Sequence, residues 1–181
     1  MDEHPMSTVE YLASDETTRP RELSYGILRE PPAPFFSHQA VVLRIARMLS
    51  AHVEAGDLGQ VGVSPVDVIL DGERDLIVQP DVLFVSAGRA SIIHDQVWGP
   101  PDLVVEVLSP GTAAHDRGAK LDWYRQYGVC ECWLVDPARE QITVIDFTRV
   151  PPRRQVLDRT AIIRSSVLPA LQAAVGPLVA C

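Results

Sequence analysis

The sequence predicts an α/β protein with a single domain, in which a mixed β-sheet is flanked by α-helices. Three patterns support this prediction: a helical apolar period in residues 37–55, strand-like alternation in residues 61–86, and a nearly continuous apolar run in residues 101–110. A chain of 181 residues can bury one core without disulfides or structural metals. Its apolar share of 46% is that of an ordinary globular protein.

The domain is expected to span residues 21–181. Residues 1–20 are expected to form a short amphipathic or disordered lead, because they contain prolines and scattered acids without a sustained period. The segment RELSYGILRE at residues 21–30 predicts a first strand or hairpin with Gly26 at its turn. From Ser37, which stands where an N-cap would stand, apolar residues recur every three or four positions and predict a helix that ends before Gly56.

The middle of the chain contains three predicted strands. Residues 61–70 and 75–86 alternate apolar with polar or small residues, and the turn sequence DGER lies between them. They therefore predict a β-hairpin of two antiparallel strands. The run PDLVVEVLSP at residues 101–110 is typical of a central strand that is covered on both faces.

The last third of the chain predicts a helix and then two strands. The helix is expected from about Ala114 to Tyr127, with Gly128 as its C-terminal stop. The segments ECWLVDP and QITVIDF, at residues 131–137 and 141–147, predict the strands. The apolar, Ala-rich tail at residues 167–180 predicts a short closing helix.

The composition also indicates where the protein works. No stretch approaches the roughly 20 consecutive apolar residues of a membrane-spanning helix, and the acidic start has no signal-peptide core, so no membrane association and a cytoplasmic location are expected. The three cysteines are an odd number, and Cys130 and Cys132 are too close in a strand to close a normal disulfide. Free thiols in a reducing compartment are the simpler interpretation.

The net charge and the choice of basic residues bear on the kind of substrate the protein could bind. The formal net charge of −8 argues against a protein that coats nucleic acid electrostatically, although it does not exclude a nuclease, whose metal-binding acids add negative charge. Several arginines could still form a local basic patch, or lip, at the edge of such a metal-binding cleft. Fifteen of the 16 basic residues are Arg, and Lys120 is the only lysine. Lysine and arginine differ where a compact ammonium must reach a phosphate or a metal-bound water. The arginines considered for the lip are Arg117, Arg125, Arg153 and Arg154.

Two acids point to a metal site. Glu106 lies in the most apolar predicted strand, where burying a carboxylate costs several kcal/mol unless a cation or hydrogen bonds compensate it. If the two strands are neighbours, Asp81 reaches the same edge of the sheet. Two carboxylates, the backbone carbonyl of Val107 and several waters would make an octahedral oxygen site for Mg²⁺ or Mn²⁺.

Lys120 is the candidate cation of this site. It lies on the helix that leaves the Glu106 strand, and that helix should pack back across the sheet, where the ammonium can point to the metal-bound water or a phosphate. Each candidate has a structural alternative. Glu106 could form an ion pair with a buried Arg, Asp81 could merely initiate a strand after Pro80, and Lys120 could be a solvated helix residue.

Three further polar residues are candidates for supporting the metal ligands. His38 is more often a cap or core histidine, although its helix could overhang the cleft. Asp67 is either a solvent-facing strand residue or a supporting acid, and Asp116 would favour the positive end of the second helix. The aromatic residues Trp123, Tyr124 and Trp133 are interpreted as core and interface residues, because nothing basic is interleaved with them.

Several segments resemble the Uma-two family of restriction-endonuclease-like proteins. The resemblance begins at RELSYGILRE, passes through the helix that contains His38, and ends at the closing VLPAL. Order, spacing and dipeptide detail together make it specific. The segments that carry it best are QPDVLFV, PPDLVVEVLSPGT and DRGAKLDWYRQYGVCECWLVDP.

The resemblance implies the fold of the PD-(D/E)XK phosphodiesterase superfamily and a divalent metal held by Asp81 and Glu106. This sequence departs from the superfamily pattern at Leu108, where the motif would have its lysine. In families with this departure a neighbouring helix is thought to supply the lysine, and Lys120 is the only candidate here. The catalytic residues expected from the resemblance are therefore Asp81, Glu106 and Lys120.

The implied function is metal-dependent endonucleolytic hydrolysis of phosphodiester bonds in DNA. A homodimer is expected, because two sites cut both strands most easily. Two alternatives stay open: a catalytically degenerate protein that binds nucleic acid or a protein partner without cutting, and a metal-dependent phosphatase. A cleft that is open at both ends and lined with Arg would favour the nuclease, whereas a closed pocket would favour the phosphatase.

Overall fold

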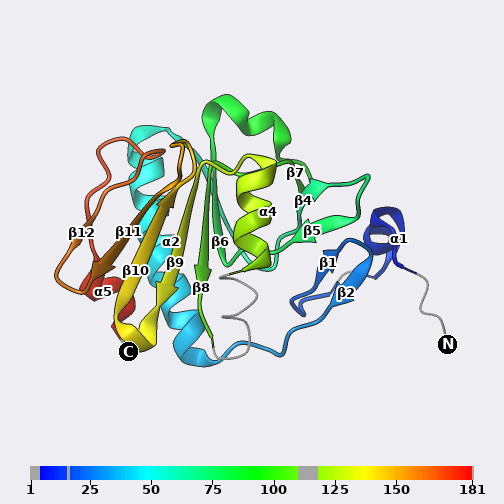
Figure 1. Cartoon of the computed structure of the whole chain (residues 1–181), viewed down its shortest axis with the longest axis horizontal. Coiled ribbons are helices and arrows are strands. Elements are labelled where there is room, and N and C mark those ends of the chain that lie inside the picture. Colours follow the sequence, from blue (N-terminus) through cyan, green and yellow to red (C-terminus); the bar gives the residue numbers. More distant parts are fainter. Residues whose placement is uncertain (1–4, 16, 110–117, 181) are drawn as a thin grey trace.

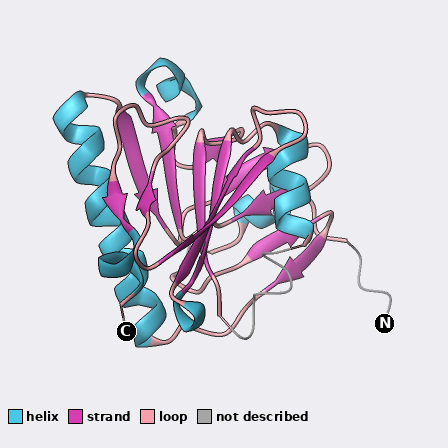
Figure 2. Ribbon diagram, turned by 60° about the vertical axis from the view of Figure 1, so that its left-hand side comes forward, coloured by secondary structure: helices cyan, strands magenta, loops and turns pink. Residues whose placement is uncertain are grey.

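The computed structural model describes residues 5–15, 17–109 and 118–180 (Figure 1). It contains a six-stranded sheet with the order β11-β10-β9-β8-β6-β3, a five-stranded sheet with the order β2-β1-β5-β4-β7, and a two-stranded sheet. Figure 2 shows helices on both sides of the larger sheet. The prediction of a mixed sheet flanked by helices in one domain is confirmed.

The segment expected to be an N-terminal lead contains a helix, α1 (Thr8–Ala13). Ser7 and Glu10 form a capping box, in which each side chain accepts a hydrogen bond from the backbone N–H of the other residue. This arrangement explains why a helix of six residues begins there. Tyr11 is fully buried in a small apolar cluster, so α1 is docked on the rest of the protein. The other members of the cluster are Leu23, Ile69 and Ile77.

The five-stranded sheet begins with the predicted hairpin. Strands β1 (Glu22–Ser24) and β2 (Ile27–Arg29) pair antiparallel, and Gly26 stands in the turn with a φ of +84°, where a side chain would be strained. The prediction of a hairpin at Gly26 is confirmed. The remaining strands of this sheet are β4 (Val68–Asp71), β5 (Leu76–Val78) and β7 (Val97–Trp98).

The prediction of two long strands in residues 61–86 is wrong. The β4–β5 hairpin does turn at the predicted DGER sequence, but the flanking segments belong to the other sheet. There, β3 (Gly59–Val63) and β6 (Val82–Ser86) pair with each other. The chain changes sheets near Pro65 and Pro80, which have no N–H for a strand ladder.

The six-stranded sheet has β8 (Leu103–Val107) near its centre, with all five residues buried, as predicted. Strand β8 lies antiparallel to β6 and parallel to β9 (Glu131–Asp136). Strand β9 continues into β10 (Gln141–Asp146) through the short 3₁₀ helix η2 (Pro137–Arg139). The two strands predicted from residue 131 to 147 are therefore confirmed. An edge strand that the sequence analysis did not predict, β11 (Arg153–Asp158), completes the sheet.

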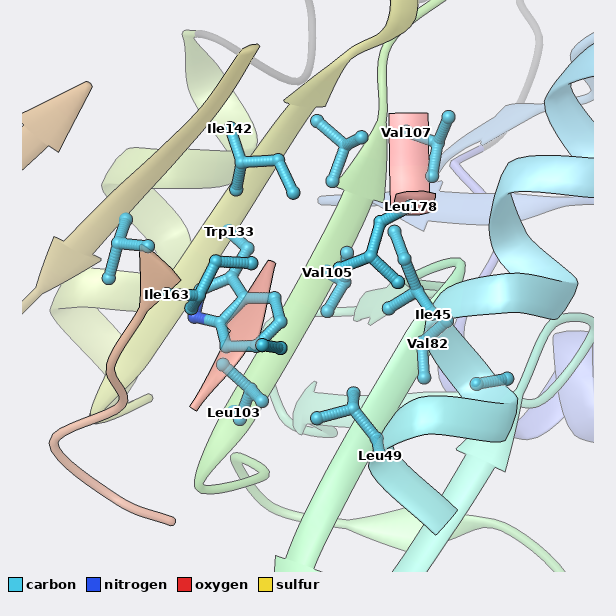
Figure 3. Close-up of a cluster of buried hydrophobic side chains, with 14 of the residues drawn as sticks. Ile45, Leu49, Val82, Leu103, Val105, Val107, Trp133, Ile142, Ile163 and Leu178 are labelled. Carbon is cyan, nitrogen blue, oxygen red and sulfur yellow. The ribbon is translucent and has the colours of Figure 1, made fainter. Parts of the chain in front are cut away.

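One face of this sheet is covered by α2 (Phe36–Gly56). The helix was predicted, but its N-cap is Phe35 and not Ser37, because the extended backbone ends at Phe35. The helix includes Gly56 and stops at Asp57, which has a left-handed backbone. Figure 3 shows side chains of α2 packed against the sheet strands. Those labelled from α2, β6, β8 and β9 are Ile45, Leu49, Val82, Leu103, Val105, Val107 and Trp133.

The closing helix α5 (Val175–Val179) is shorter than predicted. Ala170 has a left-handed backbone with a φ of 59°, which is incompatible with a helix through residues 167–180. Between Ala170 and α5, strand β13 (Ala173–Ala174) pairs with β12 (Ile162–Ile163).

The other face of the six-stranded sheet carries α4 (Ala119–Tyr127), which ends at the predicted stop, Gly128, in a left-handed conformation. Its described part begins after Gly118, and the predicted helical residues 114–117 lie outside the described residues. No described helix is long and apolar enough to cross a membrane. Among the described residues, Cys130 and Cys132 are not joined in a disulfide.

Candidate active site

The two predicted acids stand on neighbouring strands. In the β6–β8 pair, Val82 lies opposite Val105, so Asp81, which directly precedes β6, lies at the same end of this strand pair as Glu106. The Asp81 Oδ2 atom accepts a hydrogen bond of 2.7 Å from the backbone N–H of Val107. The prediction that the two strands are neighbours is therefore confirmed.

Lys120 lies against Glu106. The helix α4 follows β8 along the chain and packs back across the sheet, as predicted. Its Lys120 Nζ is 2.7 Å from Glu106 Oε1 and 2.8 Å from Glu22 Oε1. Lys120 is only 3% exposed, so its interpretation as a solvated helix residue is wrong. Glu106 pairs with this lysine, where the structural alternative expected a buried arginine.

Tyr124, interpreted from the sequence as a core or interface aromatic, lies in the candidate site. It is fully buried, and its hydroxyl donates a hydrogen bond to Glu106 Oε1. Burial raises the pKa of Tyr124 well above its ordinary value, and the nearby carboxylates of Glu106 and Glu22 raise it further. The hydroxyl therefore stays protonated and remains a donor. Its place one helical turn after Lys120 was a signal that both side chains share one face.

Glu22 is the second site residue that sequence reasoning missed. It lies on β1 of the smaller sheet and accepts hydrogen bonds from Lys120 Nζ and from the backbone N–H of Gln79. Its side chain is only 10% exposed. Glu30 stands at the other end of the same hairpin and is exposed, and nothing in the local sequence distinguishes these two acids.

Asp67 belongs to a chain of hydrogen bonds that reaches Glu22 and Lys120. Its Oδ1 atom accepts from Gln79 Nε2 and from the Tyr11 hydroxyl, each at 2.8 Å. The backbone of Gln79 donates in turn to Glu22, which contacts Lys120. The chain of contacts thus extends from α1 to the buried lysine.

His38 approaches from α2 on the opposite face of the sheet. Its Nε2 is 2.9 Å from the backbone oxygen of Val107 and 3.4 Å from Asp81 Oδ2. Leu108, two residues after Glu106, packs against the apolar cluster that contains Tyr124 of α4. The remaining candidate, Asp116, lies outside the described residues.

The donor atoms are chemically suited to a hard divalent cation. Asp81 and Glu106 supply carboxylates and Val107 supplies a carbonyl at the same end of β8. Mg²⁺ is commonly held by one or two carboxylates while it keeps several waters, so this donor set fits such an ion. Within the described ranges, no group of three or more His, Cys, Asp and Glu side chains could hold a metal.

A mixed sheet flanked by helices, with two acids on neighbouring strands and a lysine beside one of them, defines a restriction-endonuclease-like α/β protein. Residues 8–176 match the Uma2 family, described as "putative restriction endonuclease", and the chain belongs to this family. The predicted family resemblance is therefore confirmed.

Two similar proteins illustrate the relationship. The crystal structure of a "putative nuclease belonging to DUF820" from Anabaena variabilis superimposes with a TM-score of 0.81 and 19% identity, over 97% of this chain and 98% of that one. This likeness shows the shared fold. An uncharacterized protein of Synechocystis sp. is 28% identical over 131 residues, which are 72% of this chain and 67% of the relative.

Proposed function

We propose that this protein is a metal-dependent endonuclease that hydrolyses phosphodiester bonds in DNA, with Asp81, Glu106 and Lys120 as its catalytic residues. The observation that carries the proposal is the contact of the buried Lys120 ammonium with Glu106, on the strand next to Asp81. Membership of a restriction endonuclease family supports the same reaction.

The residues that would hold Mg²⁺ or Mn²⁺ are Asp81, Glu106 and, through its carbonyl, Val107. A metal bound there supplies a more acidic water and neutralises charge on the phosphate. In the overall reaction one water adds to phosphorus and the bond from phosphorus to one sugar oxygen breaks. The phosphate stays on one product, and the other product gains a hydroxyl with a proton from the water.

Lys120 would stabilise the phosphate as its negative charge grows. The ammonium is a compact charge that can donate to a non-bridging oxygen, and its low exposure strengthens that interaction. Glu22 and Tyr124 contact the Lys120–Glu106 pair and would fix its orientation. They are positioning residues in this proposal.

His38 and Asp67 would support the metal ligands. The imidazole of His38 lies beside both Asp81 Oδ2 and the Val107 carbonyl, so it would limit the movement of two proposed ligands. Asp67 would act at longer range, through Gln79 and Glu22. Asp116 is proposed for the same supporting role from its sequence position alone.

The proposal also includes a homodimeric state and a cellular location. Two copies of the protein would supply one site for each DNA strand. A homodimer predicts a mass of twice 19.9 kDa by light scattering after size exclusion, and a mass of 19.9 kDa would contradict it. A cytoplasmic location is also part of the proposal.

The test is cleavage of plasmid DNA and single-stranded DNA with Mg²⁺ or Mn²⁺. The wild type is expected to cut and the Asp81→Ala/Glu106→Ala variant to lose cutting. A matched control is Asp158→Ala, because Asp158 is an exposed acid on the edge strand of the same sheet. Equal cleavage by wild type and double variant would remove these acids from the reaction.

The alternative is a degenerate member that binds nucleic acid or a protein partner without cutting. Two observations favour it: Lys120 is held between two carboxylates, and no three metal-binding side chains gather within the described residues. A folded wild type that neither cuts DNA nor takes up Mn²⁺ in calorimetry would support this alternative.

A further inference from the structure

A pocket of about 240 Å³ is lined by residues of β9, β10 and β11 and by Leu108, which follows β8. Two arginines line it: Arg139 at the end of η2, and Arg154 in β11. Leu108, two residues after Glu106, lines the side nearest the acids. The floor contains one residue from each of three neighbouring strands: Leu134, Thr143 and Val156.

The strand registers align this pocket with the acids. Glu106 lies opposite Leu134, Leu134 opposite Thr143, and Thr143 opposite Val156. These residues therefore form one row across the same face of the sheet. Neighbouring strands are about 4.8 Å apart, so the row extends about 14 Å from Glu106. In Figure 1, α4 stands beside β8 on the side away from β10 and β11.

The lining suits a segment of nucleic acid strand. The guanidinium groups of Arg139 and Arg154 match phosphate oxygens in charge and geometry. Between them lies an apolar floor that includes Val156, which is 57% exposed in the middle of its strand. The lining contains one acid, Asp136, whose carboxylate is 3.8 Å from Arg139. The pocket lining therefore has two positively charged side chains and one negatively charged one, although the whole chain has a net charge of −8.

The length of the row also suits such a strand. Duplex DNA rises about 3.4 Å per nucleotide along each strand, so about 14 Å corresponds to about four nucleotides. Glu106 and Leu134 are buried, whereas Arg139 and Arg154 are exposed. A strand whose cut phosphate lies at the Glu106 end of the row would therefore bring later phosphates to the two arginines.

We propose that this pocket binds the substrate DNA strand two to four nucleotides from the bond cut at Glu106, with Arg139 and Arg154 on its phosphates. This inference rests on the proposed function and adds the path of the substrate to it. The arginines bind and position the strand, and they take no part in the chemical step.

The test is fluorescence anisotropy with an end-labelled single-stranded DNA oligonucleotide, measured at several salt concentrations. We expect the Arg139→Gln/Arg154→Gln variant to bind about tenfold more weakly than the wild type. Its slope of log affinity against log salt should fall by about 1.4, because each phosphate contact on a single strand contributes about 0.7.

The chain offers a closely matched control in Arg149→Gln. Arg149 and Arg139 have side chains that are 71% and 70% exposed, and each lies within 3.8 Å of an aspartate three residues earlier. Arg149 is outside the pocket lining. The control is expected to keep the wild-type affinity and slope.

Three outcomes would overturn the inference: a wild type that does not bind the oligonucleotide, a double variant with unchanged affinity and slope, or an equal loss in Arg149→Gln. These outcomes are separate from failure of the proposed function. If the wild type binds DNA through the two arginines but never cuts it, the proposed nuclease activity is contradicted and the proposed binding pocket is retained. A double variant that binds and cuts DNA as the wild type does would remove the binding pocket and leave the nuclease.

Discussion

Replacing Lys120 by Met should reveal how strongly two buried carboxylates depend on one cation. In the wild type, Lys120 Nζ contacts Glu106 and Glu22 at 2.7 and 2.8 Å, and these glutamate side chains are 4% and 10% exposed. Methionine fills a similar volume without charge, so both carboxylates would lose their shared cation. Removing one partner of a buried ion pair costs about 3–5 kcal/mol. For a chain of this size, that loss lowers Tm by roughly 6–20 °C.

The assay is urea unfolding followed by tryptophan fluorescence, combined with a double-mutant cycle. Glu22→Gln removes one of the two carboxylates, so Lys120→Met should be less damaging in that background than in the wild type. Arg125→Met is the control, because Arg125 is exposed on the same helix. It should change the free energy of unfolding by no more than about 0.5 kcal/mol.

The reasoning would be refuted if Lys120→Met cost no more than Arg125→Met. It would also be refuted if the two changes in the cycle were additive, because then Lys120 and Glu22 would not interact in the folded protein.

Four further outcomes are expected. Glu106→Gln should keep the fold and lose Mn²⁺ binding, and an unchanged calorimetric affinity would remove Glu106 from the metal site. Lys120→Arg should still fold but cut DNA far more slowly, because a guanidinium does not reproduce a compact ammonium, and equal cleavage rates would contradict this. The pKa of Tyr124 is raised in the folded protein, so its contribution to stability is complete below pH 10 and is lost as the pH rises above 10. The free energy of unfolding in urea should therefore fall less steeply above pH 10 in Tyr124→Phe than in the wild type. Glu131→Ala should cost about 3 kcal/mol or more in the same assay, since Glu131 is fully buried and accepts from the Trp133 indole and from Ser166; a loss below 1 kcal/mol would argue against that network.

The sequence predicted elements well where one pattern had one physical cause. The continuous apolar run of β8 matched a strand covered on both faces, and the recurring apolar residues of α2 matched one buried helix face. Strand β11 escaped prediction because it is an edge strand with mostly exposed residues. The division of residues 61–86 between two sheets depended on partners far away in the chain, which no local alternation can identify.

The candidate site was predictable to the extent that its residues were anomalous. Glu106 was an acid in an apolar strand, Lys120 was the only lysine, and the structure brings these two residues together. Tyr124 and Glu22 carried no comparable anomaly. An aromatic residue on a helix and an acid beside a hairpin are ordinary features, and their burial arises only when the two sheets and α4 come together.

Lys120 joins the two sheets of the molecule, because Glu22 belongs to the smaller sheet and Glu106 to the larger one. The ion pair therefore depends on how the sheets are docked and not only on how each sheet is built. Mild denaturation that separates the sheets would hydrate all three charges while most strand ladders stay intact. Under such conditions the geometry around Glu106 should be lost before the far-ultraviolet circular dichroism changes, so the state of the site would report the assembly of the whole domain.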